Sequence, residues 1–435
     1  MQTLTWLQLP RCREKAQGLP ALIVCPTSLV ENWRREAEKF VPWMKCLVLS
    51  GPERSRRFAQ VPDQDLVITS YALIRRDIAF HAQARFSVVV LDEAQAIKNQ
   101  RTQNAQAVKQ LSADTRLVLS GTPIENGVAD LWSIMDFLMP RYLGPYEDFK
   151  VAYEDAIEMG GALAEAAQQR LRDKLHPFLL RRVKKEVAKD LPDKIRTVTY
   201  CELSPDQRKV YDSLRDKVRH QMRDMVKSKG FEKSKFEMLA LLMHLRQVCC
   251  DLRLLKDRSA RPGEAPSAKL DALMELLDEA RSGGHRMLVF SQFTSMLQLI
   301  AERLSSDSIP FCYLDGSTKN RLAECARFNQ TPEIPLFLIS LKAGGTGLNL
   351  TGADMVVHFD PWWNPAAEEQ ATDRAHRIGQ KKTVQAIKLI ALDTIEEKVL
   401  EMQRKKQALI EATVNASDAS LISSLTMADI EDLLS

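Results

Sequence analysis

The sequence predicts an α/β protein with two lobes, each containing a parallel sheet covered by helices on both faces. Three observations lead to this expectation. The 435 residues allow roughly two to four domains at about 150 residues each. Short runs rich in Val, Ile and Leu, without strict alternation, are typical of strands buried on both faces of a parallel sheet. Segments of helical pattern alternate with these runs towards both ends of the chain, as in doubly wound folds.

The first lobe is expected at residues 1–150. Segments of helical pattern, such as 28–40 and 104–111, lie between its strands. The strands themselves are expected at residues 21–25, 46–49, 66–69, 87–91 and 116–120.

Residues 151–265 are mainly helical in pattern and are expected to form an insertion and a linker. The clearest helices are predicted at 154–180, 205–227 and 236–255. The segment 179–196 carries seven basic and three acidic residues, a net charge of +4. Such a face suits phosphate contact, but a charge run is as often only solvated, and both interpretations stay open. The polar stretch 257–268, rich in Pro, Gly and Ser, is the best linker candidate.

A second lobe is expected at residues 266–400, followed by a helical brace at 401–435. Its first helix is predicted at 269–280. Its strands are expected at residues 286–291, 311–314, 335–340, 354–359 and 385–392. In the tail, Thr426 and Asp429 have the spacing of a capping box before a short amphipathic helix.

Composition excludes several classes of protein without naming a partner. Lys and Arg number 61 against 57 Asp and Glu, and a net charge of +4 is too small to indicate nucleic acid or membrane. The eight cysteines have no paired CxxC spacing, which favours reduced thiols over a disulfide framework or a zinc site. No stretch reaches about 18 apolar residues and the amino terminus lacks a signal pattern, so we expect a soluble intracellular protein.

Two adjacent carboxylates, Asp92 and Glu93, follow the buried run of residues 88–91. At the carboxyl end of a strand, Asp92 is suited to hold a Mg²⁺ that bridges nucleotide phosphates, while Glu93 orients and deprotonates the attacking water. An acidic strand end that caps the next helix would look the same, so the motif alone leaves both interpretations level.

Three further segments strengthen the nucleotide interpretation. Ser120 begins the sequence SGTP after the next strand, where hydroxyls are placed to sense a hydrolytic site, although Gly and Pro are routine in turns. Residues 341–350 contain three glycines in four positions, which allows the backbone to approach a phosphate. Arg374 and Arg377 are three residues apart and would project from one helical face towards a γ-phosphate, unless they only form surface ion pairs with Asp373.

Ten motifs in order along the chain resemble the Swi/Snf-type ATPases of helicase superfamily two, with a bacterial-like pattern. The motifs are VCPTSLVENW (24–33), ITSY (68–71), LDEAQAIKN (91–99), LSGTPIEN (119–126), LRQVCC (245–250), VFSQFT (289–294), YLDGST (313–318), KAGGTGLNL (342–350), DPWWNP (360–365) and QATDRAHRIGQ (370–380). The resemblance implies two RecA-like lobes, a family-specific helical insertion, and ATP-driven translocation along double-stranded DNA without strand separation.

The resemblance also implies roles for single residues. Asp92 and Glu93 would be the Mg²⁺ and water-activating pair, and Arg374 and Arg377 the arginine fingers. Residues on the ATP side of the second lobe would be Gln370, Gly345 and Gly347. Residues that contact the DNA backbone would be Thr27, Ser28, Ser70, Ser317, Thr318 and Lys342. Trp362 would stack or wedge against DNA, although two Trp flanked by prolines also suit a rigid packing corner, and at least one is expected to pack.

One departure from the family pattern concerns the P-loop. The sequence contains no G-x-x-x-x-G-K-[ST] segment, and residues 1–9 resemble the helix that follows that loop in the family. Because this loop anchors the β- and γ-phosphates, we expect the 435 residues alone to be inactive in ATP hydrolysis. We expect a fragment of a longer ATPase, the alternative being a pseudoenzyme that retains only DNA binding or protein docking.

The expected cofactors are ATP and Mg²⁺, and the expected partner is double-stranded DNA, with a DNA-bound protein complex as a further candidate. A cytoplasmic, nucleoid-associated monomer without a membrane partner is the expected state.

Overall fold

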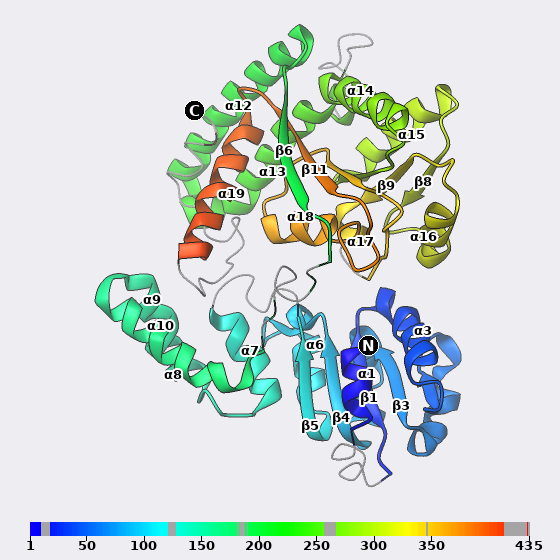
Figure 1. The fold of residues 1–435 in the computed structure, drawn as a ribbon. Helices are drawn as coiled ribbons and strands as arrows, with labels where there is room; N and C mark the ends of the chain where they lie inside the picture. The colour runs from blue at the N-terminus through cyan, green and yellow to red at the C-terminus, as the bar shows by residue number, and fades with distance from the viewer. Residues whose placement is uncertain are drawn as a thin grey trace. The chain divides into compact units, whose positions relative to one another are not determined.

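The computed structural model describes residues 1–9, 18–120, 128–180, 182, 188, 190–255, 267–344, 347–412 and 433. The described residues divide into two compact units, one up to Leu180 and one from Arg182 onward, and each is considered by itself. Figure 1 shows a sheet in each unit with helices against it. No helix in the described ranges has the length and apolar composition to cross a membrane.

The first unit contains a five-stranded parallel sheet in the order β2-β3-β1-β4-β5. The strands are β1 (Ala21–Cys25), β2 (Cys46–Val48), β3 (Leu66–Ser70), β4 (Arg85–Asp92) and β5 (Ser112–Leu119). The helices are α1 (Gln2–Leu7), α3 (Val30–Phe40), α4 (Tyr71–Arg76), α5 (Ile78–His81), α6 (Gln103–Lys109) and α7 (Val128–Leu138).

Both faces of this sheet are buried, which explains the unbroken apolar runs. In β1, Leu22 and Val24 pack with residues of α4, α6 and α7, whereas Ile23 and Cys25 pack with residues of α1 and α3. A strand covered on both faces has no solvent side and therefore needs no polar alternation. Three short helices, α8 (Tyr146–Phe149), α9 (Ala156–Met159) and α10 (Gly161–Leu175), complete the unit, with residues of α8 and α10 in one apolar cluster with α7.

The second unit contains a six-stranded parallel sheet in the order β6-β11-β10-β7-β9-β8. The strands are β6 (Lys194–Cys201), β7 (Met287–Ser291), β8 (Phe311–Leu314), β9 (Leu336–Ser340), β10 (Met355–His358) and β11 (Val384–Ala391). The helices are α12 (Pro205–Lys229), α13 (Phe231–Cys250), α14 (Ala268–Ser282), α15 (Thr294–Ser306), α16 (Arg321–Gln330), α17 (Leu341–Gly344), α18 (Pro365–Thr372) and α19 (Ile395–Ala412).

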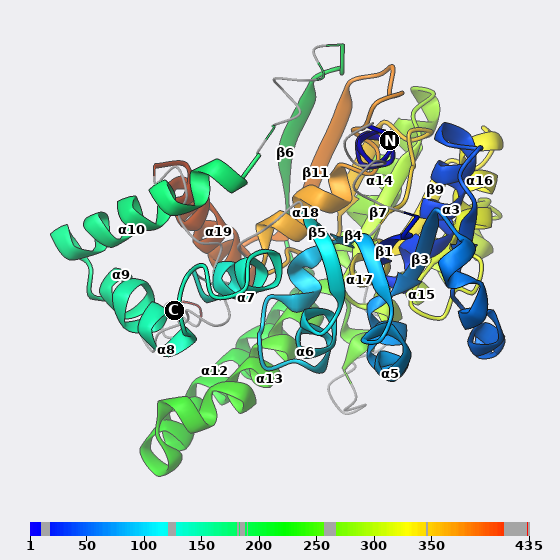
Figure 2. The same cartoon turned by 90° about the horizontal axis from the view of Figure 1, so that it is seen from below.

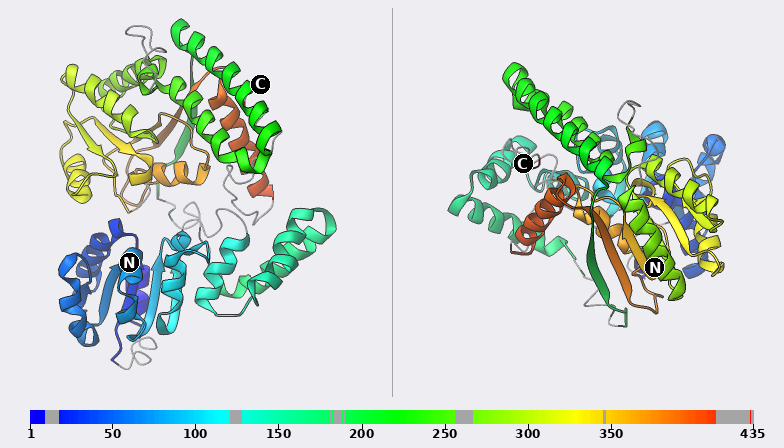
Figure 3. Two further views of the ribbon diagram at one scale, coloured as in Figure 1. Left: turned by 180° about the vertical axis from the view of Figure 1, so that it is seen from behind. Right: turned by 90° about the horizontal axis from the view of Figure 1, so that it is seen from above.

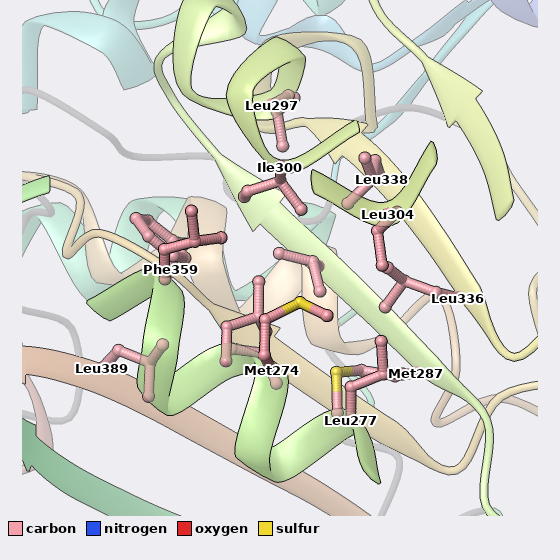
Figure 4. Close-up of a cluster of buried hydrophobic side chains, with 14 of the residues drawn as sticks. Met274, Leu277, Met287, Leu297, Ile300, Leu304, Leu336, Leu338, Phe359 and Leu389 are labelled. Carbon is pink, nitrogen blue, oxygen red and sulfur yellow. The ribbon is translucent and has the colours of Figure 1, made fainter. Parts of the chain in front are cut away.

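The largest apolar cluster of this unit lies between the sheet and helices α14 and α15. Figure 4 shows Leu277 of α14 and Ile300 of α15 together with strand residues Met287 and Leu338, all of them at most 1% exposed. A second cluster covers the opposite face with residues from α16 and from the segments around α17 and α18. The second sheet is therefore also buried on both sides, as the apolar runs predicted.

Strand β6 differs from the sequence expectation, because it lies within the segment predicted to be mainly helical. It pairs in parallel register with β11 along its whole length, from Lys194 opposite Val384 to Cys201 opposite Ala391 (Figure 2). As the edge strand of the sheet, β6 exposes Ile195 and Tyr200 and mixes polar with apolar side chains. Its sequence therefore contains no uninterrupted apolar run that would predict a strand.

Helices α12, α13 and α19 form a separate layer with its own core. Val218 and Met222 of α12, Leu242 of α13 and Val399 of α19 are fully or almost fully buried in this cluster, and Figure 3 shows α19 beside the α12–α13 pair. Leu433 belongs to the same cluster, whereas the rest of the predicted tail helix lies outside the described residues. The four segment boundaries derived from the sequence remain predictions.

The α/β fold class is thus confirmed, with two parallel-sheet units and a helical layer formed by α12, α13 and α19.

Candidate active site and DNA-contact residues

The carboxyl ends of three neighbouring strands bring the predicted residues of the first unit to one edge of the sheet. Strand β1 lies between β3 and β4, with Cys25 opposite Ser70 and Val24 opposite Leu91. Asp92 therefore ends the strand on one side of β1 and Ser70 ends the strand on the other. Thr27 and Ser28 follow directly after β1.

Asp92 is held from two directions. Its Oδ2 accepts a hydrogen bond from the indole Nε1 of Trp33, at 2.8 Å, and its Oδ1 accepts one from the backbone N–H of Glu93, at 3.0 Å. The hydroxyl of Tyr71 donates to the backbone carbonyl of Asp92, at 2.9 Å. Burial raises the pKa of the Asp92 carboxyl, while the bonds from Trp33 and Glu93 oppose that rise.

Glu93 adopts a left-handed backbone conformation, with φ of +52°. For a residue with a side chain this conformation costs of order 1–3 kcal/mol and is concentrated at functional sites. It turns the chain sharply from β4 into the short 3-10 helix Ala94–Ile97 and leaves the Glu93 side chain half-buried at the edge.

A relay of two hydrogen bonds joins Glu93 to the end of the neighbouring strand. The Gln95 amide Nε2 donates to Glu93 Oε2, at 2.6 Å, and the Ser120 hydroxyl donates to Gln95 Oε1, at 3.3 Å. Ser120 is thus in indirect contact with the carboxylate that it was expected to sense. The following residues of that motif, 121–123, lie outside the described part of the chain.

The two predicted DNA-contact regions of this unit differ in exposure. Thr27 is exposed and Ser28 is half-buried in the 3-10 helix Thr27–Leu29. Ser70 is only 1% exposed, so its hydroxyl lies below the surface. The sugar-phosphate backbone of bound DNA would reach this hydroxyl only after a local rearrangement of the protein.

In the second unit, the predicted phosphate loop and the predicted arginines lie against one another. The backbone N–H of Leu350 donates to the carbonyl of Arg374, at 3.0 Å, and Arg377 Nη1 donates to the carbonyl of Leu348, at 3.3 Å. Gly347 has φ of +68° in this loop, a conformation that glycine adopts without strain. Gly345 lies outside the described residues.

The arginine segment differs from expectation in its backbone. Helix α18 carries Gln370 but ends at Thr372, so Arg374 and Arg377 lie in turns and do not share one helical face. Beyond the helix end, Gln380 Nε2 donates to the carbonyls of Ala353 and Ala375. Arg374 is 9% exposed, whereas Arg377 is exposed.

Residues next to the two arginines contact the start of strand β6 and the segment that precedes it. Lys194 pairs with Glu369 and Asp373, and His376 Nε2 donates to the carbonyl of Pro192, at 2.7 Å. His376 therefore makes a structural contact with the backbone that precedes β6.

Three other predicted DNA-contact residues lie on the surface of the second unit. Lys342 is exposed on α17. Ser317 and Thr318 lie in a turn capped by Asp315, whose Oδ1 accepts bonds from the N–H and the hydroxyl of Ser317, at 2.8 and 2.6 Å. The bond from the Ser317 hydroxyl is the main reason that the pKa of Asp315 lies below its usual range, although partial burial acts in the opposite direction. An ionised carboxylate thus shares the turn with the two hydroxyls.

The two tryptophans of the predicted DNA-contact loop have different roles. Trp363 is 7% exposed and packs in the helical-layer core, with the Arg246 guanidinium 5.4 Å from its ring. Trp362 is half-buried, and its backbone is fixed by a bond from its N–H to Glu368, at 2.6 Å, and by Gln403, which donates to its carbonyl. The expectation that at least one tryptophan packs is therefore met by Trp363.

Several residues that shape these sites were given no role by the sequence. Trp33, Tyr71 and Gln95 lie inside recognised motifs, but their contacts with Asp92 and Glu93 depend on strand order. Arg246 could have been noticed as the one charged residue in the apolar stretch 245–250.

Comparison with known proteins assigns both units. Residues 1–254 match the SNF2-related domain and residues 268–379 match the helicase conserved C-terminal domain. An uncharacterized ATP-dependent helicase of Mycoplasma genitalium, MG018, is 38% identical over 412 residues, covering 94% of this chain and 38% of that protein. The putative ATP-dependent helicase/translocase YwqA of Bacillus subtilis is 36% identical, covering 96% of this chain and 45% of that protein.

More distant relatives include the TATA-binding protein-associated factor MOT1 of Saccharomyces cerevisiae, 33% identical over 94% of this chain and 25% of its own length. The chain thus spans less than half the length of these relatives. The Sulfolobus solfataricus SWI2/SNF2 ATPase core in complex with dsDNA is 33% identical, with a TM-score of 0.45 and coverage of 99% of this chain and 89% of that one. On the extent of the domain match and the identity to its relatives, the chain belongs to the SNF2 family of helicase-like ATPases.

Proposed function

We propose that this chain is the motor core of an ATP-dependent translocase that moves along double-stranded DNA. The observation that carries the proposal is the pair Asp92 and Glu93 at the carboxyl edge of the first sheet. There, Asp92 is fixed by Trp33, and Glu93 is connected through Gln95 to Ser120.

The first unit suits Mg²⁺ at Asp92. A carboxylate whose pKa is raised by burial gains stability from a nearby cation, and carboxylate oxygens are the ligands Mg²⁺ prefers. Asp92 would hold the ion, which would neutralise charge on the nucleotide phosphates, and Glu93 would orient the attacking water and take its proton. Within the described residues, no group of three or more His, Cys, Asp or Glu side chains is placed to bind a metal ion, consistent with a site completed by nucleotide and water.

The nucleotide site needs more than these residues supply. Arg374 and Arg377 would stabilise charge in the transition state, and Gln370, Gly345 and Gly347 are the residues that we propose for contact with ATP. The 435 residues contain no G-x-x-x-x-G-K-[ST] loop for the β- and γ-phosphates. We therefore propose that hydrolysis depends on such a loop being supplied from outside this sequence.

Contact with DNA is proposed for the exposed polar residues at the edges of the two sheets. Thr27 and Ser28 begin a helical segment and carry hydroxyls suited to phosphate contact, and Lys342 supplies a cation. Trp362 and the Ser317–Thr318 turn are further proposed contacts in the second unit, and Ser70 is a buried candidate in the first. None of these side chains is arranged to read a base, so binding without sequence preference is expected.

The partner of the motor is proposed from the relatives. Their names include a putative ATP-dependent helicase/translocase and a TATA-binding protein-associated factor, so we propose that the target is a protein complex bound to duplex DNA. A monomer acting in the cytoplasm on nucleoid DNA is the form in which we propose that the core works.

Salt-dependent binding tests the DNA part of this proposal. Affinity for a 30-base-pair duplex, measured by fluorescence anisotropy, should fall steeply with salt, and Lys342→Gln should reduce the slope of log K against log [salt] by about 0.9. The matched control is Lys39→Gln, which removes an exposed charge from the far end of α3 and should leave the slope unchanged. If the slope of log K against log [salt] is the same in both variants, Lys342 does not contact DNA.

The alternative function is a DNA-binding or docking module without catalysis. It predicts duplex affinity that ATP and Mg²⁺ never change and no turnover even when a Gly-Lys-Thr loop is joined to the chain. Turnover that appears with the loop and is lost in Glu93→Gln would reject this alternative.

A further inference from the structure

Asp92 is the point where two helices from different parts of the first unit make contact with the proposed hydrolytic pair. One helix supplies Trp33, which bonds to the carboxylate of Asp92, and the other supplies Tyr71, which bonds to its backbone carbonyl. Both contacts come from side chains that are buried, Trp33 at 9% and Tyr71 at 4% exposure.

The helix that carries Trp33 begins at proposed DNA-contact residues. The 3-10 segment Thr27–Leu29 continues into α3 without a break, because Leu29 and Val30 both keep right-handed helical backbone angles. Thr27 and Ser28 therefore lie at the start of one continuous segment, and Trp33 lies about one and a half turns further along it.

Trp33 has little freedom to move independently of this helix. Its ring packs among apolar residues of the first unit together with Leu29, Val30 and Ala37 of the same helical segment. A displacement of the segment therefore displaces the indole N–H. The bond to Asp92 is 2.8 Å long, and an increase of about 0.7 Å would take it beyond hydrogen-bonding range.

The second helix repeats the arrangement. Tyr71 is the first residue of α4 and directly follows Ser70, the end of β3. Its hydroxyl bonds to the carbonyl of Asp92, which forms the peptide bond with Glu93. Glu93 holds a left-handed conformation, so the orientation of this peptide helps to set where its side chain points.

We infer that Trp33 and Tyr71 are positioning residues that couple duplex binding at Thr27 and Ser28 to the geometry of Asp92 and Glu93. The inference rests on the proposed function, since it takes the DNA contact and the hydrolytic pair from there. Neither residue touches DNA or nucleotide. Their role is to transmit a small displacement of α3 and α4 to the carboxylate and the peptide that they hold.

Fluorine NMR of the full 435-residue chain labelled with 5-fluorotryptophan tests the inference without ATP. The six tryptophans give six signals, and Trp33→Phe identifies that of Trp33. A saturating 30-base-pair duplex should shift the Trp33 signal, and Asp92→Asn should shift it without DNA. Trp43 is the matched control, because it is 63% exposed beyond the end of the same helix and donates to Gln8. Its signal should move in neither case.

A double-mutant cycle on duplex affinity gives a second readout that a merely structural role would not move. Coupling between two sites is reciprocal, so a change at Asp92 must alter DNA affinity if DNA alters Asp92. We expect Asp92→Asn to change the duplex Kd about fivefold, at the lower end of typical coupling. The same substitution should change it less than about twofold when Trp33→Phe and Tyr71→Phe are present. In a Trp43→Phe background the fivefold change should persist.

The outcomes separate this inference from the proposed function. If the chain binds duplex DNA while the Trp33 signal does not shift, the coupling is wrong and the DNA proposal stands. The same conclusion follows if Asp92→Asn changes the duplex Kd equally in every background. A chain that binds no duplex DNA would overturn both. Tyr71→Phe removes only the hydroxyl donor, whereas Trp33→Phe removes the indole N–H together with part of the ring, and a cooperative thermal unfolding transition in both variants would show that the fold is preserved.

Discussion

Replacing Arg246 with Met should destabilise the second unit strongly, because it leaves a buried carboxylate without its cation. Arg246 is 1% exposed and Asp360 is fully buried, with 3.8 Å between Nη2 and Oδ2. The guanidinium also donates to Gln292 and to the carbonyl of Pro361. After substitution, Asp360 keeps only the bonds from the Ser291 hydroxyl and the Gln292 N–H.

The size of the effect follows from this geometry. Two unit charges 3.8 Å apart interact with about 4 kcal/mol at an effective dielectric constant near 20. Breaking a buried pair typically costs about 3–5 kcal/mol, since the remaining charge is uncompensated. For a unit of this size, 1 kcal/mol corresponds to about 2–4 °C, so a loss of about 3–5 kcal/mol should lower the midpoint by about 6–20 °C.

The pH dependence of the loss gives a further check. Burial raises the pKa of Asp360 above its unfolded value, with Arg246 the main opposing influence. A group with a raised pKa in the fold binds its proton more tightly there, so the cost of burying its charge fades as pH falls through that pKa. The difference in stability between wild type and Arg246→Met should therefore narrow as the pH is lowered from 8.

Scanning calorimetry of four chains measures the pair: wild type, Arg246→Met, Asp360→Asn and the double variant. The double variant should recover at least half of the loss, because it has no unpaired charge. Arg281→Met, which breaks an exposed pair with Asp278, is the control and should cost less than about 1 kcal/mol. A loss below about 1 kcal/mol in Arg246→Met, or no recovery in the double variant, would refute the reasoning.

Two further predictions concern the same unit. Trp363→Ala should lower the free energy of unfolding in urea by about 3–5 kcal/mol, because Trp363 is 7% exposed in the helical-layer core. Trp362→Ala should lower it less and should instead weaken the affinity for duplex DNA. Equal losses of stability in the two variants would contradict this distinction. Lys194→Met should destabilise the unit at pH 7. Burial raises the pKa of Glu369, but Lys194 and Arg196 outweigh it and hold this pKa below its ordinary value of 4.5. The ion pair therefore stabilises the fold above pH 4.5, and this stabilisation is lost as the pH falls through the folded-state pKa of Glu369. The unfolding curves of the two chains should then converge once the pH is below the folded-state pKa of Glu369, and a deficit that persists under acid conditions would contradict the ion-pair explanation.

The sequence predicted those parts of the fold that depend on burial of local segments. Strand β1 reads as an apolar run because both of its faces are covered, and Asp92 at the end of β4 could be placed by the same pattern. Strand β6 could not, because an edge strand keeps polar side chains and is defined by its distant partner β11. Spacing also predicted a shared helical face for Arg374 and Arg377, but the helix ends at Thr372, before both arginines.

The candidate site was predictable in its residue types and only in part in its contacts. The pairing of Trp33 with Asp92 depends on β1 lying next to β4, which becomes visible only in the strand order. The loop that carries Trp362 is fixed by Glu368 and Gln403, which no motif contained. Buried polar contacts between distant segments leave little trace in a single sequence.

ATP hydrolysis measured with and without duplex DNA, in the 435-residue chain and in the same chain joined to a Gly-Lys-Thr loop segment, tests the central claim most directly. We expect turnover only when the loop is present, stimulation of that turnover by duplex DNA, and a fall of about 10²–10⁴-fold in Glu93→Gln with nucleotide binding retained. Robust duplex-stimulated turnover without the loop, or full turnover in Glu93→Gln, would contradict the assignment.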